Sequence, residues 1–154
     1  MPPKAVVIVG RGPSLRNNSY GPTIDSIGFV IRLKKAMTDP VHLGLRTDIV
    51  CSRSGDDRPH WLYPDCIDAA RWKAHFKKFS SHPKPSTGAS ACFCVAELLP
   101  HVDEIVLAGC DYLMHPNPRH PNHTWGHHSL GEHRAIHALG LTITDIKECH
   151  GEVR

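Results

Sequence analysis

The chain has 154 residues, a length that fits one domain with a substantial hydrophobic core. Its formal net charge of +3 suits an anionic ligand, but without a dense Lys and Arg stripe it gives little support for nucleic-acid binding. No apolar run approaches the roughly 20 residues of a membrane span, and the first residues lead into a strand pattern instead of a signal-peptide core. We therefore expect a cytoplasmic protein without a membrane span. Whether it forms a homo-oligomer is left open.

In the first half of the chain, three short apolar runs have the character of strands. They cover residues 5–9, 27–33 and 48–52. Residues 65–79 then mix apolar and basic side chains at helical spacing, which predicts a helix with one face toward the core.

The second half continues the alternation of helix and strand. Residues 89–99 are small and apolar almost all round, as in a helix buried against a sheet. Residues 104–108 form the clearest later strand, 129–139 a short helix that stops at Gly140, and 141–146 a last strand. Five strands and three or four helices predict an α/β fold. We expect one Rossmann-like domain with a mainly parallel sheet, whose ligands bind beyond the carboxyl ends of the strands.

Six cysteines are scattered along the chain. The closest pair, Cys92 and Cys94, has one residue between its members, whereas zinc knuckles and redox motifs have two. We therefore expect buried, reduced thiols.

A glycine-containing loop follows the first strand directly. Gly10 and Gly12 lack side chains, so the backbone can come close to a phosphate or a sugar. The dinucleotide-binding fingerprint is incomplete, because Leu15 stands where its third glycine should be. The loop is therefore either a ligand-binding loop or a tight turn.

The segment Pro85-Ser86-Thr87-Gly88 opens the helix predicted at 89–99. Either hydroxyl side chain can cap the helix by accepting a hydrogen bond from a free N–H group. A helix N-terminus also offers unpaired donors and a partial positive charge, so phosphate or carboxylate binding is an equally good interpretation.

Eight of the thirteen histidines lie from His115 onward. His127 comes just before the helix predicted to begin at Ser129, where the positive potential of a helix N-terminus favours a neutral imidazole that can accept a proton. Ser129 and Glu132 have capping-box spacing, so Glu132 is either structural or part of the site. Prolines interrupt the segment and we find no His-x-x-x-His on a regular helix, so we expect no metal site.

Three segments, in this order, resemble the eukaryotic-type sialyltransferase family. The large sialylmotif is similar to residues 6–15, 20–25, 29–36 and 46–48. The small sialylmotif is similar to residues 85–88, 102–106 and 109. The very short motif, a histidine and a glutamate with four residues between them, is similar to 127–132, and residues 134–140 resemble the family's last helix.

The resemblance implies a variant GT-A enzyme over residues 1–154 that inverts configuration and needs neither metal nor cofactor. Its donor would be a CMP-linked 2-keto sugar acid of sialic-acid type, and its acceptor a hydroxyl group of an unknown glycan or other molecule. His127 would be the catalytic base, with Glu132 beside it in the motif. The implied donor-binding residues are Gly10, Arg11, Gly12, Ser14, Lys34, Ser86, Thr87, Gly88 and His123.

The sequence also departs from the family pattern. Arg11 or Gly12, and Lys34, stand where the family has asparagines, which implies an altered donor. The family's disulfide positions hold no cysteine here, which fits a reducing compartment. Its histidine-aromatic motif matches His115, His120 or His123. Only about 36 residues, 49–84, separate the large-motif and small-motif segments, fewer than is usual in the family.

Two other functions remain open. The short middle segment favours a nucleotide-binding module without catalysis. Basic residues interleaved with Trp72 and Phe76 suggest a protein that binds or modifies nucleic acid, although we expect a solvated helix face there and no nucleic-acid partner. The basic residues are Arg71, Lys73, Lys77, Lys78 and Lys84.

Overall fold

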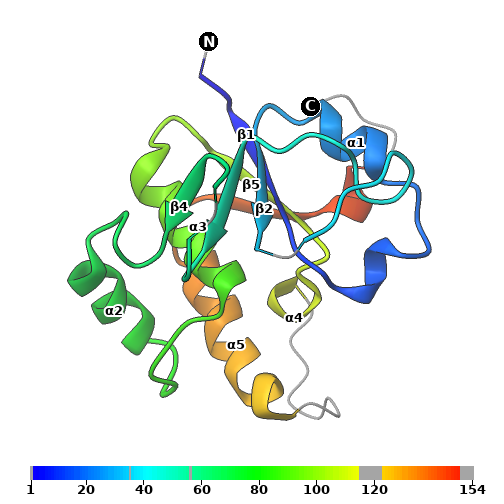
Figure 1. The fold of residues 1–154 in the computed structure, drawn as a ribbon. Coiled ribbons are helices and arrows are strands. Elements are labelled where there is room, and N and C mark those ends of the chain that lie inside the picture. The colour runs from blue at the N-terminus through cyan, green and yellow to red at the C-terminus, as the bar shows by residue number, and fades with distance from the viewer. Residues whose placement is uncertain (1, 35, 56, 115–122, 150–154) are drawn as a thin grey trace.

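The computed structural model describes residues 2–34, 36–55, 57–114 and 123–149, except the side chains of Tyr112 and of residues 123–129. In this part of the chain, six parallel strands form one sheet in the order β4-β3-β2-β1-β5-β6 (Figure 1). The strands are β1 (Ala5–Val9), β2 (Val30–Leu33), β3 (Ile49–Ser52), β4 (His60–Leu62), β5 (Glu104–Ala108) and β6 (Thr142–Asp145). The predicted α/β fold with a parallel sheet is confirmed, and the sheet has one strand more than predicted.

The burial of each strand explains which strands could be predicted from the sequence. β1 and β5 lie side by side in the middle of the sheet, and four of the five residues of each are buried. A strand covered on both faces has a nearly continuous apolar sequence, so the predicted bounds of these two strands agree with the structure. β4 was not predicted, because this edge strand has only three residues, all half-buried, and begins with His60.

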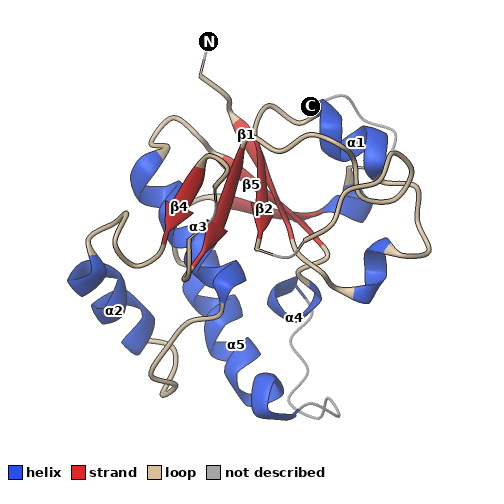
Figure 2. Ribbon diagram, in the orientation of Figure 1, coloured by secondary structure: helices blue, strands red, loops and turns tan. Residues whose placement is uncertain are grey.

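The two faces of the sheet are covered differently (Figure 2). The described helices are α1 (Gly21–Ser26), α2 (Ala69–Lys77), α3 (Thr87–Leu98), α4 (Asp111–Met114) and α5 (His123–His137), with 3-10 turns at Pro13–Leu15 and Ile146–Glu148. Successive side chains of a strand point to opposite faces. Val6 and Ile8 of β1 therefore pack with α2, α3 and α5, whereas Val7 and Val9 pack with α1 and the two 3-10 turns.

The last helix corrects the predicted one. α5 begins at His123, six residues before the predicted start at Ser129. The predicted start lies at the last capping signal, but the helix extends back almost to Pro121, the last proline of the preceding segment. The predicted capping box is therefore wrong, since Glu132 lies inside the helix, about two and a half turns from its start. The described helices include none with the length and apolar character needed to cross a membrane.

The strand order places the expected binding region. The chain runs outward in one direction through β1, β2, β3 and β4, and then returns to the other side of β1 with β5 and β6. In such sheets, ligands bind beyond the carboxyl ends of the strands where the order reverses. Here that point lies between the loops that follow β1 and β5.

Candidate functional site

The loops after β1 and β5 are packed tightly against each other. The Gly12 N–H donates to the Gly109 carbonyl oxygen over 2.6 Å, and Ser14 Oγ donates to Asp111 Oδ1 over 2.5 Å. A Cβ atom on Gly10 would lie only 2.7 Å from the same Gly109 oxygen. The two glycines of the first loop are thus required by loop packing, as the tight-turn interpretation predicts, and the loop also borders a pocket.

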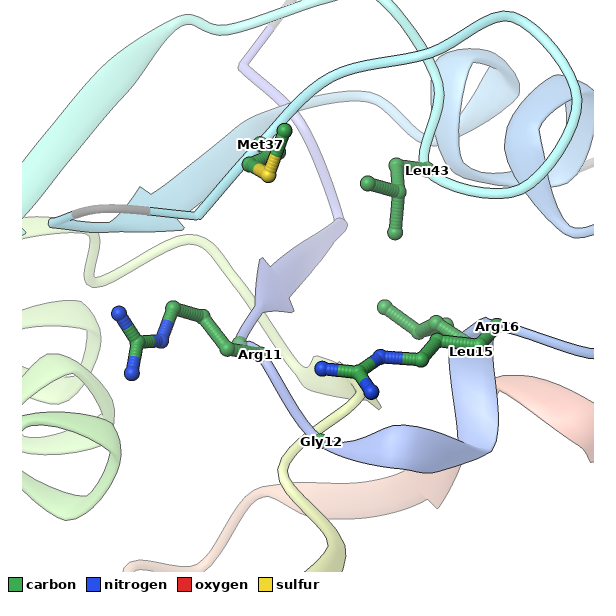
Figure 3. Close-up of a pocket in the computed structure, with 7 residues that line it drawn as sticks. Arg11, Gly12, Leu15, Arg16, Met37 and Leu43 are labelled. Atoms are coloured by element: carbon green, nitrogen blue, oxygen red, sulfur yellow. The ribbon is translucent and has the colours of Figure 1, made fainter.

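A pocket of about 270 Å³ opens between the β1 loop and the connection from β2 to β3. Its lining residues are Gly10, Arg11, Gly12, Leu15, Arg16, Met37 and Leu43. Figure 3 shows Arg11 and Arg16 on one side of the pocket and Met37 and Leu43 on the other. One wall is therefore cationic and the opposite wall apolar.

The cationic wall is not neutralised by the rest of the described chain. Arg11 and Arg16 are exposed, and neither guanidinium forms an ion pair or hydrogen bond with another described residue. The lining includes no Asp or Glu side chain of the part of the chain that the structure describes. This arrangement suits a ligand with a negative group that arginine can hold by several hydrogen bonds, and with an apolar or aromatic part.

A buried arginine supports the apolar wall. Arg32 on β2 is 0% exposed, and its Nε donates to the Arg46 carbonyl oxygen and to Thr47 Oγ1, each over 2.9 Å. Its Nη1 donates to the carbonyl oxygen of Met37 over 3.4 Å. Burial lowers the pKa of Arg32, and its Nη2 atom has no partner among the described residues. Arg32 thus fixes both ends of the β2 to β3 connection.

Two acidic side chains stabilise the conformation of the connection from β2 to β3, which forms the apolar wall of the pocket. Asp25 of α1 accepts hydrogen bonds from the backbone N–H groups of Leu45 and Arg46, each at 2.9 Å. Asp39 accepts from the N–H groups of Val41 and His42, at 2.9 and 2.6 Å. The bond from His42 is the largest cause of the lowered pKa of Asp39. The pocket wall is therefore a hydrogen-bonded structure and not a loose loop.

The second predicted phosphate site is a capped helix N-terminus. Ser86 Oγ accepts the Ala89 N–H over 3.2 Å and so caps α3, which begins at Thr87. The Ser86 N–H donates in turn to Oε2 of Glu132, a side chain that is only 3% exposed. Gly88 packs against Leu113, since a Cβ there would lie 2.8 Å from Leu113 Cδ1. The predicted cap is confirmed, and the separate bond from Ser86 to Glu132 joins two segments 46 residues apart.

The predicted donor-binding residues do not all meet at one pocket. Gly10, Arg11 and Gly12 line the pocket at β1, but Ser86, Thr87 and Gly88 do not. Ser14 bonds to Asp111 instead. Lys34 also points elsewhere, because its Nζ donates to Ser54 Oγ over 2.5 Å and to the Gly55 carbonyl oxygen over 3.1 Å.

Four lining residues were missed by the sequence analysis: Leu15, Arg16, Met37 and Leu43. A second cation in the glycine loop was a usable signal for Arg16. The positions of Met37 and Leu43 depend on how the β2 to β3 connection folds, which no local pattern reveals.

The histidine-rich segment is only partly described. His123 and His127 lie in α5, so His127 is inside a helix and not just outside its N-terminus as predicted. Both also have i, i+4 spacing on a regular helix, which the sequence analysis took to be absent. His115 and His120 lie outside the described residues. Among described side chains, no group of three His, Cys, Asp or Glu could hold a metal ion, and the roles of these histidines stay predictions.

The structure argues against base stacking on α2. Trp72 and Phe76 are only 3% and 2% exposed and belong to the core. Their basic neighbours Arg71, Lys73, Lys77 and Lys78 are exposed, as expected for a solvated helix face. The aromatic side chains are therefore not available to stack on nucleic-acid bases.

Comparison with known proteins adds one finding. Residues 3–56 match the model of glycosyltransferase family 29 (sialyltransferase). This segment contains β1, β2 and β3 and every residue that lines the pocket at β1. No curated protein and no solved structure matches the chain. The match confirms the predicted resemblance of the chain to the sialyltransferase family over residues 3–56, and at the level of the family it supports a glycosyltransferase.

Proposed function

We propose that the chain transfers a 2-keto sugar acid of sialic-acid type from a CMP-linked donor to a hydroxyl group of a glycan or other acceptor. The observation that carries this proposal is the pocket at the carboxyl end of β1. It lies within the family-matched segment, beside the loop that follows β1, and no described residue pairs with its two arginines. The family's disulfide positions hold no cysteine here, which supports our further proposal of a reducing compartment.

The two walls of the pocket match the two parts of a nucleotide. Arg11 and Arg16 would hold the phosphate through charge-assisted hydrogen bonds. Met37 and Leu43 would cover the flat face of the base. Because neither guanidinium group is paired with a described carboxylate, a phosphate gains attraction without displacing an ion pair.

The reaction needs a base, an acceptor hydroxyl and a stabilised leaving group. The acceptor oxygen forms a bond to the anomeric carbon while the bond from that carbon to the phosphate oxygen of CMP breaks. CMP leaves with the bonding electrons, the base takes the acceptor proton, and attack opposite the leaving group inverts the configuration. Arginines at the phosphate compensate its charge, so the chemistry requires no metal ion.

We propose His127 as the base. Its helix, α5, is tied to the N-terminus of α3 by Glu132 and to α4 by His133, whose Nδ1–H donates to the Leu113 carbonyl oxygen over 2.5 Å. The N-terminal turns of α5 extend beyond the carboxyl ends of the strands (Figure 1). This is the region in which a ligand of this sheet is expected.

A binding measurement tests the donor assignment. CMP at millimolar concentration should raise the melting temperature, since it binds only the folded chain, whereas UDP and NAD should raise it less. In calorimetry, the double variant Arg11→Gln and Arg16→Gln should bind CMP roughly tenfold more weakly or worse. Lys4→Gln with Lys78→Gln removes the same charge elsewhere and serves as the control.

Two results would contradict the proposal in different ways. Stabilisation by another nucleotide but not by CMP would refute the donor. Tight CMP binding without transfer to any hydroxyl acceptor would favour the nucleotide-binding module. The family match favours that alternative in one respect, because it ends at residue 56 and covers the nucleotide pocket but not α5.

A further inference from the structure

A second cationic pocket lies on the other side of the sheet's carboxyl edge. It has a volume of about 210 Å³ and is bordered by α2, by the residues after β3 and β4, and by the segment that leads into α3. Four cationic side chains line it: Arg53, Lys73, Lys77 and Lys84. Among the described residues, no Asp or Glu side chain belongs to its lining.

The cations of this pocket are brought together by both helix geometry and tertiary contacts. Lys73 and Lys77 are four residues apart on α2 and thus share one face of the helix. Arg53 is fixed, because its Nη2 donates to the Pro85 carbonyl oxygen and its guanidinium lies 5.2 Å from the centre of the Tyr63 ring. Lys84 directly precedes Pro85 in the chain and so joins the same group.

This grouping carries an unfavourable charge interaction. Like charges at i, i+4 destabilise a helix, and none of the three lysines pairs with a carboxylate of a described residue. A bound anion removes that repulsion and gains attraction from several cations at once. The site is therefore electrostatically prepared for an anionic group.

The remaining walls indicate the rest of the ligand. Tyr63 and three prolines give the pocket stiff, largely apolar surfaces. Its volume is below the roughly 300 Å³ at which pockets for drug-sized molecules begin, so it has room for one small unit and not for a polymer. A sugar ring, with an apolar face and a charged substituent, has this combination of properties.

We propose that Arg53, Lys73, Lys77 and Lys84 bind an acidic sugar, a saccharide unit that carries a carboxylate or a sulfate. The role of this unit as part of the acceptor rests on the proposed transferase function, whereas the binding itself does not. β3 and β1 are separated only by β2, so the ends of these strands lie about 10 Å apart. An acceptor anchored by its acidic unit at β3 could therefore extend toward a donor at β1.

Calorimetry with lactose disulfate and with lactose tests the site, because the two probes differ only in their sulfates. The native chain should bind lactose disulfate and not lactose, and the affinity should fall as salt increases. The double variant Lys73→Gln and Lys77→Gln should bind lactose disulfate roughly tenfold more weakly. Glutamine is a good helix former, so α2 should remain folded.

The control variant is Arg71→Gln with Lys78→Gln, which removes the same charge from α2 but lies at a different pocket. It should change the affinity for lactose disulfate less than twofold. Equal losses in both double variants, or a loss only when Arg11 and Arg16 are replaced, would overturn the site. If the lysine-dependent binding is present but CMP does not bind, the anion site stands and the proposed transferase function fails.

Discussion

His127 is the residue on which the proposed transfer reaction depends most directly. His127→Ala should lower kcat by about 100- to 10,000-fold, the usual cost of losing a general base, while CMP affinity changes little. Steady-state kinetics with a CMP-linked sugar acid and calorimetry with CMP separate the two effects.

The neighbouring histidine is the matched control for this prediction. In a regular helix, positions 128 and 132 lie on nearly the same face, whereas 127 and 132 are about 140° apart. If His128→Ala abolishes turnover and His127→Ala does not, the base is His128 and the motif assignment is off by one residue. If neither substitution matters, α5 carries no base in this segment.

Cys110 gives the chain a pH-dependent reactivity. Burial, followed by the negative charge of Asp111, raises the pKa of this thiol from 9.0 to about 12. The native thiol should therefore react slowly with iodoacetamide at pH 8 and faster only as the pH approaches 12. Because the unfolded chain loses this proton at a lower pH than the folded chain, the free energy of unfolding does not depend on this group below pH 9 and falls as the pH rises from 9 to 12.

Mass spectrometry after alkylation at a series of pH values checks this prediction. The same reaction in denaturant, without reductant, should label all six cysteines, since the structure joins none of them in a disulfide. Rapid labelling of Cys110 at pH 8 in the folded chain would contradict the raised pKa.

At the scale of elements, the contact between α5 and the N-terminus of α3 decides whether Glu132 is structural. Glu132→Leu leaves the partly buried Ser86 N–H without its acceptor and should lower the free energy of unfolding by about 1–3 kcal/mol. Glu132→Gln retains an oxygen that can accept this hydrogen bond, so its loss should be smaller. Urea denaturation measures both.

Turnover of the same two variants then separates packing from chemistry. If Glu132→Gln keeps both stability and rate, Glu132 acts only as a cap for α3. A variant that is stable but slow would show that the carboxylate also takes part in the reaction. Equal stability of Glu132→Leu and the native chain would contradict the structural role.

The elements also show what can be inferred from a sequence. The bounds of β1 and β5 were predicted because two-sided burial produces continuous apolar runs. The cap at Ser86 was predicted because capping is a local interaction. The start of α5 was predicted wrongly, because Ser129 and Glu132 have the spacing of a capping box. The Glu132 carboxylate instead accepts a hydrogen bond from Ser86, at the N-terminus of α3. Local signals identify the partners of a residue only when those partners are near in sequence.

For the molecule as a whole, the sequence predicted where the site lies better than it predicted which residues line it. The glycine loop at the carboxyl end of a central strand does border the pocket that Arg11 and Arg16 line. Lys34 and Ser86 do not line it. The Lys34 side chain donates a hydrogen bond to Ser54 instead, and the Ser86 side chain caps α3. Met37 lines it because a buried arginine holds its backbone.

The hydrogen bond between Ser14 and Asp111 has a consequence for protein engineering. Asp111 begins α4, and the carbonyl oxygen of Leu113 in the same helix receives the bond from His133 of α5. Helix α4 therefore links the pocket loop, through Ser14, to the helix that carries position 127, through His133. Transplanting this pocket onto another α/β scaffold would require the β5 loop and α4 as part of the same graft, because the glycine loop alone would arrive without the partners that shape it.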